Sequence, residues 1–347
     1  MANCNELFHE YNSTIRLSDD KRIELIGVRD NLRGRIQTGY QIVAENFNHR
    51  HQLEFQSQGS FVMDTIIRPI HDDYDLDDGL YFIGSLRRED RPSPEDFHNW
   101  VRQALDRGHD DIEKIIDKPT CVRVRYKEGF HVDIPIYYAS NLNAPDLADK
   151  VKWWILSHPI EFIAWFESKI NSGFQKAFLL ESKMYSEFEK WTNDIRKADH
   201  QLRRIVRYMK SWADLRREEM PCGIIMTILA ANHYSPHQRD DIALKETLVN
   251  IEAELKKNFK CERPTTPEGE DLLIGYKNKD AFMQYLRYFI DNAKEALEES
   301  NQKKACALWQ KSLGERFPCH LAKDDIKVNL ATSSLAAGAT GNKPWAT

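Results

Sequence analysis

Apolar residues recur at helical spacing in two parts of the chain. The first part is residues 19–47, which follow the helix-initiating sequence Ser18-Asp19-Asp20 and are expected to form one long helix. The second part begins after Asp149, where the pattern becomes almost wholly helical. The helices expected there cover residues 158–170, 182–217, 221–233, 243–259, 279–299 and 302–313.

Residues 55–138 have a different, mixed pattern. A strand is expected at 74–82 and a helix at 94–107. Two β-rich runs, at 121–126 and 130–138, flank Lys127-Glu128-Gly129, which suits a short hairpin turn. The fold class predicted from these patterns is α+β, with a mixed β-sheet in the first lobe and a C-terminal helical lobe.

The changes of pattern divide the chain into three predicted parts. Residues 1–150 form the first lobe with its long N-terminal helix, and residues 151–322 form the helical lobe. Residues 323–347 are expected to be a flexible C-terminal tail. From residue 331 onward this tail is small, polar and nearly uncharged, too poor in apolar residues to pack as a core.

Composition excludes several classes of protein. With 41% hydrophobic residues the chain can bury a sizeable core, while a net charge of −5 argues against a non-specific coat for nucleic acid. The six cysteines lie far apart without a CxxC pair, so neither a zinc site nor a disulfide framework is expected. No secretory signal and no run of 18 apolar residues is found. These features favour a cytoplasmic protein without a membrane partner.

Carboxylates are concentrated in one short segment. Asp73, Asp75 and Asp77 alternate with Tyr74 and Leu76, so a strand would place the three acids on one face. Like charges this close together require a cation.

A further acid, Asp133, follows in the second β-rich run. It points away from the core positions Val132 and Ile134, and it can join the first acids from a neighbouring strand. Hard oxygen ligands suit Mg²⁺ or Mn²⁺, and two such ions about 3.5 to 4 Å apart would activate an attacking hydroxyl and stabilise a leaving pyrophosphate. The pattern therefore favours phosphoryl-transfer chemistry, with catalytic and metal-binding roles for Asp75, Asp77 and Asp133.

The acidic segment has other possible explanations. A solvated acidic loop is one of them. A calcium-binding EF-hand is excluded, since the required loop glycine is Asp78 here and the closing glutamate is Gly84. Neither a P-loop nor a Rossmann glycine motif is present.

Upstream of these acids lies Gln58-Gly59-Ser60, a candidate phosphate-binding turn. Glycine lets the backbone approach a phosphate closely, and serine adds a hydroxyl donor. A glycine-serine pair alone is also a common turn. Its position before the acids makes a nucleotide-binding role for these three residues more specific.

Two basic patterns could contact the nucleotide. In the predicted helix, Arg203, Arg207 and Lys210 form a stripe at i, i+4 and i+7, with Lys210 at the border of the apolar face. The alternative is a solvated basic face. Arg123 is expected on the sheet that carries Asp133, where it could contact a phosphate or a base of the nucleotide. The alternative is that Arg123 is an exposed strand residue.

Taken together, these segments closely resemble the cGAS/DncV-like nucleotidyltransferases of bacterial anti-phage (CBASS) systems, nearest their DncV-like branch. The resemblance spans about residues 55–315. The segments that carry it are QGSFVMDTIIRP, DYDLDDG, CVRVRYKEGFHVDIPIY, LRRIVRYMKSWAD and MPCGIIMTILAA. It implies a polymerase-β-like nucleotidyltransferase core, a helical lobe that closes the active-site cleft, and synthesis of a cyclic oligonucleotide second messenger from ATP, GTP or other NTPs.

The resemblance also implies roles for single residues. Asp75 and Asp77 would bind both metal ions, and Asp133 the catalytic ion. The remaining matches are Gly59 and Ser60 with the phosphate-holding turn, Lys210 with a lysine near the donor triphosphate, and Arg123 with a nucleotide-contacting arginine. Two departures concern nucleotide choice: Met63 replaces an aromatic residue, and Cys222-Gly223 replaces a serine pair. Residues 262–267 resemble the loop that closes over the nucleotide.

Partners and rival functions follow from the same resemblance. Related systems imply an effector protein that is reached through the product, and a ubiquitin-like conjugation enzyme that acts on the C-terminal tail. The rival functions are a nucleotidyltransferase with a linear product, like oligoadenylate synthases or poly(A) polymerases, and a catalytically silent nucleotide-binding scaffold. The presence of all three acids disfavours the scaffold.

Overall fold

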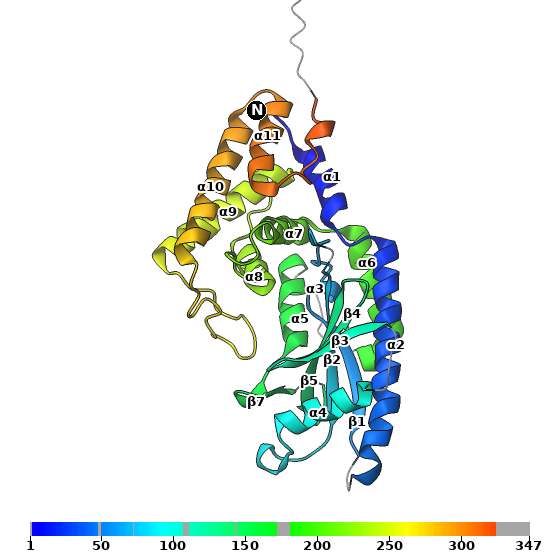
Figure 1. Ribbon diagram of the computed structural model, residues 1–347. Helices are drawn as coiled ribbons and strands as arrows, with labels where there is room; N and C mark the ends of the chain where they lie inside the picture. The colour runs from blue at the N-terminus through cyan, green and yellow to red at the C-terminus, as the bar shows by residue number, and fades with distance from the viewer. Residues whose placement is uncertain are drawn as a thin grey trace, which may run out of the picture.

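The structure is a computed structural model that describes residues 2–47, 50–71, 73–106, 111–142, 144–171 and 181–323. It contains a sheet lobe and a helical lobe, which Figure 1 shows below and above the central helix α7. The tail predicted at 323–347 lies, from residue 324 onward, outside the described residues. Within the described ranges, no helix is both long and apolar enough to cross a membrane.

The sheet is mixed, as predicted. Its main strand order is β1-β2-β5-β4-β3, and β6 pairs with β5 and β7. Only the central pair β2 and β5 is parallel, while the other pairs are antiparallel. The strands are β1 (Gln52–Gln58), β2 (Asp75–Ile83), β3 (Ile112–Asp117), β4 (Cys121–Tyr126), β5 (His131–Ala139), β6 (Asp146–Asp149) and β7 (Trp153–Leu156).

One face of this sheet packs on two helices. Alternate residues of β5, such as Val132 and Ile134, are buried together with residues of α2 (Asp19–Val43) and α4 (Pro94–Leu105). Ser18 caps α2 as expected, by accepting a hydrogen bond from the Lys21 amide. The long helix predicted at 19–47 is therefore confirmed as α2 and the short η1 (Ala44–Asn46). On the opposite face, Tyr81 of β2 and Tyr137 of β5 are buried in a second core together with residues of α5 (Pro159–Ile170), and the acids stand nearer the beginning of the same two strands.

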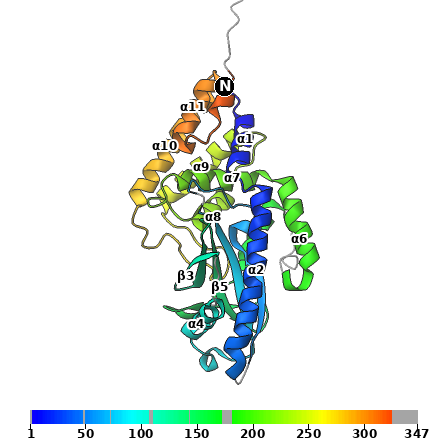
Figure 2. The same ribbon diagram turned by 45° about the vertical axis from the view of Figure 1, so that its right-hand side comes forward.

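The helical lobe has its own core, and Figures 1 and 2 show its helices grouped above the sheet. Residues 2–15 pack in this core, although they precede α2 in the sequence. The division of the chain into two lobes at residue 150 stays a prediction. The helices of this group are α1 (Asn5–Ile15), α7 (Gln201–Asp214), α8 (Gly223–His233), α9 (Asp240–Lys257), α10 (Lys279–Glu298) and α11 (Gln302–Leu313). Two further helices, α5 and α6 (Glu181–Ala198), lie beside the sheet and contact β1.

Two expectations were wrong. Residues 182–217 do not form one helix, because the chain breaks between α6 and α7 at Asp199, which has a positive φ of 30°. Apolar spacing is helical on both sides of this break, so periodicity did not reveal it. The cysteines do include one disulfide, Cys306–Cys319, because η4 (Cys319–Leu321) folds back onto α11 and brings the two Cα atoms to 5.5 Å.

The basic stripe of α7 is buried at the junction of the two lobes. Arg203 and Arg207 are 1% and 0% exposed, so the alternative of a solvated basic face is wrong. Each of the three stripe residues donates a hydrogen bond to one of three consecutive carbonyls that follow α3 (Gly59–Val62). The pairs are Arg203 with Met63 at 2.6 Å, Arg207 with Asp64, and Lys210 with Thr65 at 3.2 Å.

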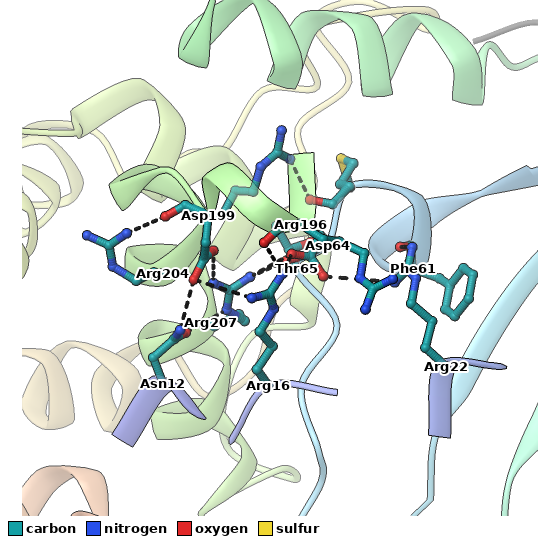
Figure 3. Close-up of polar contacts among 12 residues, drawn as sticks. Asn12, Arg16, Arg22, Phe61, Asp64, Thr65, Arg196, Asp199, Arg204 and Arg207 are labelled. Atoms are coloured by element: carbon teal, nitrogen blue, oxygen red, sulfur yellow. Dashed lines mark hydrogen bonds and ion pairs between the residues drawn. The ribbon is translucent and has the colours of Figure 1, made fainter. Parts of the chain in front are cut away.

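Carboxylates complete this junction network, which Figure 3 shows around Asp64 and Asp199. Asp64 accepts a hydrogen bond from Arg16 at 2.6 Å and lies 3.5 Å from Arg207. Arg207 also forms an ion pair with Asp199 and donates to Asn12 at 2.8 Å. Burying so many charges is tolerable only because they are paired with one another.

We expect Arg207→Met to destabilise the protein by about 3–5 kcal/mol, because it removes the fully buried cation that pairs with Asp64 and Asp199 and leaves them only the partly exposed Arg16 in common. Urea unfolding of the full-length protein measures this loss. The matched control is Arg87→Met, which removes an exposed arginine and should cost less than about 1 kcal/mol. Equal stabilities of the two variants would show that the junction network does not hold the lobes together.

Candidate active site

The three predicted acids lie on one face of two adjacent central strands. Asp75 and Asp77 stand on β2, and Asp133 stands on β5. The parallel register pairs Asp77 directly with Asp133. The side chains between them, Leu76 and Val132, are buried on the opposite face, so alternation directs the acids away from the core. The cluster expected from the sequence is brought together by the sheet.

The turn before α3 lies against this cluster. Gly59 has a positive φ of 69°, and a Cβ atom there would lie 2.2 Å from Oδ2 of Asp77. Only glycine fits this close approach. Gln58 pairs in register with Asp77 and lies 3.5 Å from the Tyr137 hydroxyl, while Ser60 lines the cavities described below.

The acids differ in their electrostatic environment. Burial raises the pKa of Asp77 well above its ordinary value, and the nearby carboxylates of Asp75 and Asp133 raise it further. Burial alone would also raise the pKa of Asp133, but its hydrogen bonds and ion pair with Arg123 prevail and lower it. Asp77 is therefore the acid that gains most from a bound cation.

Basic side chains of the chain neutralise part of this charge. Arg123 donates to both oxygens of Asp133, at 2.6 and 2.7 Å, and lies 3.9 Å from Asp75. Lys118 also reaches Asp133, at 3.2 Å. The alternative that Arg123 is simply an exposed strand residue is wrong. Lys118 was not predicted, because it follows β3 without any motif that signals its position.

Lys210 lies at the border between the two lobes, where it lines both of the cavities described below. Its Nζ donates to the Thr65 carbonyl and hydroxyl, both at 3.2 Å. Burial lowers the pKa of Lys210 to about 8, although the charge of Asp77 opposes this shift. The lysine is therefore charged at neutral pH and becomes neutral in mildly alkaline solution.

A histidine that the sequence analysis did not single out joins the acids. His131 is the register partner of Asp75 and stands two residues before Asp133, on the same face of β5. Residues two positions apart in a strand share a face, so the predicted strand that carries Asp133 could have indicated His131 as well. The Nδ1 atom of His131 lies 2.9 Å from Asp73, and the Nε2 atom lies 3.0 Å from Asp75. Asp73 was predicted to share a strand face with the other acids, but it lies just before β2.

The donor set fits a divalent cation. Ligand atoms from Asp75, His131 and Asp133 all lie within 4.8 Å of one another. Carboxylate oxygens suit Mg²⁺ or Mn²⁺. Asp133 can accept hydrogen bonds from Arg123 and still offer lone pairs to a cation, because an ionised carboxylate has about four acceptor positions.

Two cavities flank the acid cluster. The first has a volume of about 410 Å³ and is bounded by the Gly59-Ser60 turn, Asp77 and residues of α5 and α8. The second has about 450 Å³ and extends past Arg123 and His131. Each volume is within the range of small-ligand sites. The residues that line both cavities are Ser60, Asp75, Lys210, Cys222 and Gly223.

The chain is similar to known nucleotidyltransferases. Residues 53–137 match the family model of the cyclic GMP-AMP synthase DncV-like nucleotidyltransferase domain. A cyclic GMP-AMP synthase of Escherichia coli is 25% identical over 329 residues, covering 84% of this chain and 72% of that protein. A c-di-GMP synthase of Roseivirga ehrenbergii is 24% identical over 288 residues, covering 74% of this chain and 72% of that protein.

A solved structure shares the fold. The crystal structure of Vibrio cholerae DncV cyclic AMP-GMP synthase in complex with the linear intermediate 5′ pppA(3′,5′)pG has a TM-score of 0.68 and 17% identity, and the match covers 89% of this chain and 97% of that chain. Fold and family model together define a nucleotidyltransferase. Residues 53–137 therefore form a DncV-like nucleotidyltransferase domain, and most of the chain is similar to cGAS/DncV-like nucleotidyltransferases.

The raised pKa of Asp77 gives a prediction for stability. Because the folded pKa lies above the unfolded value of 3.8, the metal-free protein loses stability as pH rises from about that value through the folded pKa. Asp77→Asn removes this loss, so the variant should be more stable than the wild type near pH 7 in EDTA. Thermal melts between pH 4 and 8 measure the difference.

The control for this experiment is Asp194→Asn, which changes an exposed acid of α6 and should follow the wild-type pH dependence. A metal-free Asp77→Asn protein that is less stable than the wild type at neutral pH would contradict the electrostatic description of the cluster.

The pKa of Lys210 gives a prediction for ligand binding. Affinity for a fluorescent NTP analogue, measured without metal, should weaken as pH rises through about 8, because Lys210 loses its charge there. Lys210→Met should bind more weakly at pH 7 and show little change up to pH 9. Lys197→Met, which alters an exposed lysine, should behave like the wild type. Unchanged wild-type affinity over this range would exclude Lys210 as a phosphate contact.

Proposed function

We propose that this enzyme joins ATP, GTP or other NTPs into a cyclic di- or trinucleotide and releases pyrophosphate. The observation that carries the proposal is the pair of cavities on either side of one acid cluster. Asp75 lines both cavities, so nucleotides in them would present an α-phosphate and a sugar hydroxyl to one side of the cluster. The activities named for the Escherichia coli and Roseivirga ehrenbergii relatives support this reaction class.

The donor nucleotide belongs in the first cavity and the acceptor in the second. Gly59 and Ser60 border the first cavity, where Gly59 leaves room for a phosphate and Ser60 offers a hydroxyl donor. Lys210 adds a positive charge at the boundary. Arg123 lies in the second cavity, where it can contact the acceptor nucleotide.

Each transfer forms a bond from the acceptor hydroxyl oxygen to the α-phosphorus and breaks the bond to the pyrophosphate oxygen. A second transfer within the linear product closes the ring. Two Mg²⁺ or Mn²⁺ ions held by Asp75, Asp77 and Asp133 would activate the hydroxyl and neutralise the leaving group. The protein contributes alignment, because the turn and both strands hold the donors before nucleotides bind.

The proposed biological role is anti-phage defence in the bacterial cytoplasm. The cyclic product would act as a second messenger of a CBASS system and activate an effector protein. The enzyme would meet this effector only through the product. The composition of residues 331–347 suits a segment that enters the cleft of a ubiquitin-like conjugation enzyme.

Product analysis tests the proposal. Purified enzyme is incubated with pairs of labelled NTPs and Mg²⁺ or Mn²⁺, and the products are identified by mass spectrometry. The expected product has the mass of a cyclic oligonucleotide, without a terminal triphosphate. Asp75→Asn with Asp77→Asn should remain folded and lose pyrophosphate release by a factor of about 10³ or more. A linear product would show that the protein is a nucleotidyltransferase that does not close the ring. NTP binding without any turnover would show that it is a catalytically silent scaffold.

Removal of residues 324–347 tests the role of the C-terminal segment. The truncated enzyme should keep wild-type synthesis in vitro, because the described residues that line the two cavities lie between Gln58 and Thr266. Steady-state rates with saturating NTPs give the comparison. A large loss of activity in a truncated protein with normal thermal stability would place the segment in the catalytic machinery.

A further inference from the structure

The imidazole of His131 is buried within the acid cluster but has no place in the proposed two-metal reaction. It is 5% exposed and stands on β5 beside Asp75 of β2. It lines the second cavity together with Asp75 and Arg123. A buried polar ring at such a position needs partners for both nitrogen atoms.

Only one ring nitrogen has a hydrogen-bond partner. Nδ1 lies 2.9 Å from Oδ1 of Asp73, at hydrogen-bond geometry. Nε2 is buried and makes no hydrogen bond with any residue that the structure describes. It nevertheless lies 3.0 Å from Oδ1 of Asp75. Two acceptor atoms at this distance repel each other unless a proton or a cation lies between them.

The arrangement matches one side of a metal coordination sphere. Metal–ligand bonds of about 2.1 Å at right angles place neighbouring ligand atoms about 3.0 Å apart. Histidine ligands of metals usually donate their other ring N–H to a carboxylate, which fixes the ring. Asp73 provides that carboxylate for His131.

We propose that Nε2 of His131 is a direct ligand of a divalent cation, together with Asp75 and Asp133, and that Asp73 positions the ring. The inference deepens the proposed function, since it rests on the same acid cluster. An imidazole ligand favours transition metals over Mg²⁺, which prefers oxygen. The site is therefore a mixed nitrogen and oxygen centre that selects Mn²⁺ over Mg²⁺.

The direct test is pulsed electron paramagnetic resonance of the full-length protein loaded with Mn²⁺ alone. Electron spin-echo modulation from a coordinated ¹⁴N nucleus should appear in the wild type and change to the ¹⁵N pattern after labelling with ¹⁵N-histidine. His131→Asn should lose the modulation and bind Mn²⁺ more weakly by on the order of tenfold or more, while its Mg²⁺ affinity changes less. His9→Asn, at an exposed position on α1, is the matched control.

A second variant separates ligation from positioning. Asp73→Asn keeps the imidazole but weakens its orientation, so the nitrogen modulation should remain while Mn²⁺ affinity falls by on the order of 10-fold to 100-fold. The wild-type spectrum decides the question even if His131→Asn does not fold. Absence of nitrogen modulation in Mn²⁺-loaded wild type would overturn the proposal and leave His131 as a hydrogen-bond donor to Asp75.

The outcome is independent of the proposed reaction. Nitrogen modulation in a protein that forms no nucleotide product would support the metal site and refute the synthase activity. Cyclic product formation by a protein without nitrogen modulation would refute only the histidine ligand.

Discussion

The hydrogen bonds between α7 and the backbone of residues 63–65 are the constraint on which the active site depends. The amides of Thr65 and Ile66 donate in turn to the Ser60 carbonyl, at 2.9 and 3.1 Å. The helical lobe therefore determines, through two layers of hydrogen bonds, where Ser60 stands relative to the acids. Because Arg207 contributes to this ladder and to the buried ion pairs, the binding turn has its observed form only while the two lobes are in contact.

Charge balance is the second constraint. Burial raises the pKa of Asp77, and the two neighbouring carboxylates raise it further, so the ionised form of this acid is unfavourable without a cation. Arg123 and Lys118 offset part of that charge at Asp133. The same side chains are available to nucleotide phosphates, so ligand binding and the redistribution of internal ion pairs are expected to occur together.

The parts of the molecule whose residues follow a regular period could be predicted from the sequence. Alternation placed Asp133 opposite the core, and helical spacing with a Ser18 cap defined α2 correctly. Features without a period were missed: the break at Asp199 depends on a local backbone angle and on distant ion pairs, and the Cys306–Cys319 bridge depends on how η4 folds back. Burial of the α7 arginines could not be predicted, because their partners come from distant segments. The roles of the site residues in catalysis stay predictions.

The close approach of Gly59 to Asp77 limits how this site can change during evolution. Alanine is disfavoured there twice, once by the positive φ and once because the Asp77 carboxylate would have to move away from the added Cβ atom. Two independent penalties leave almost no route by which the turn could acquire a side chain. New nucleotide preferences are therefore expected at other positions of the cavity wall, such as the exposed Cys222, while the phosphate end of the pocket keeps the same shape.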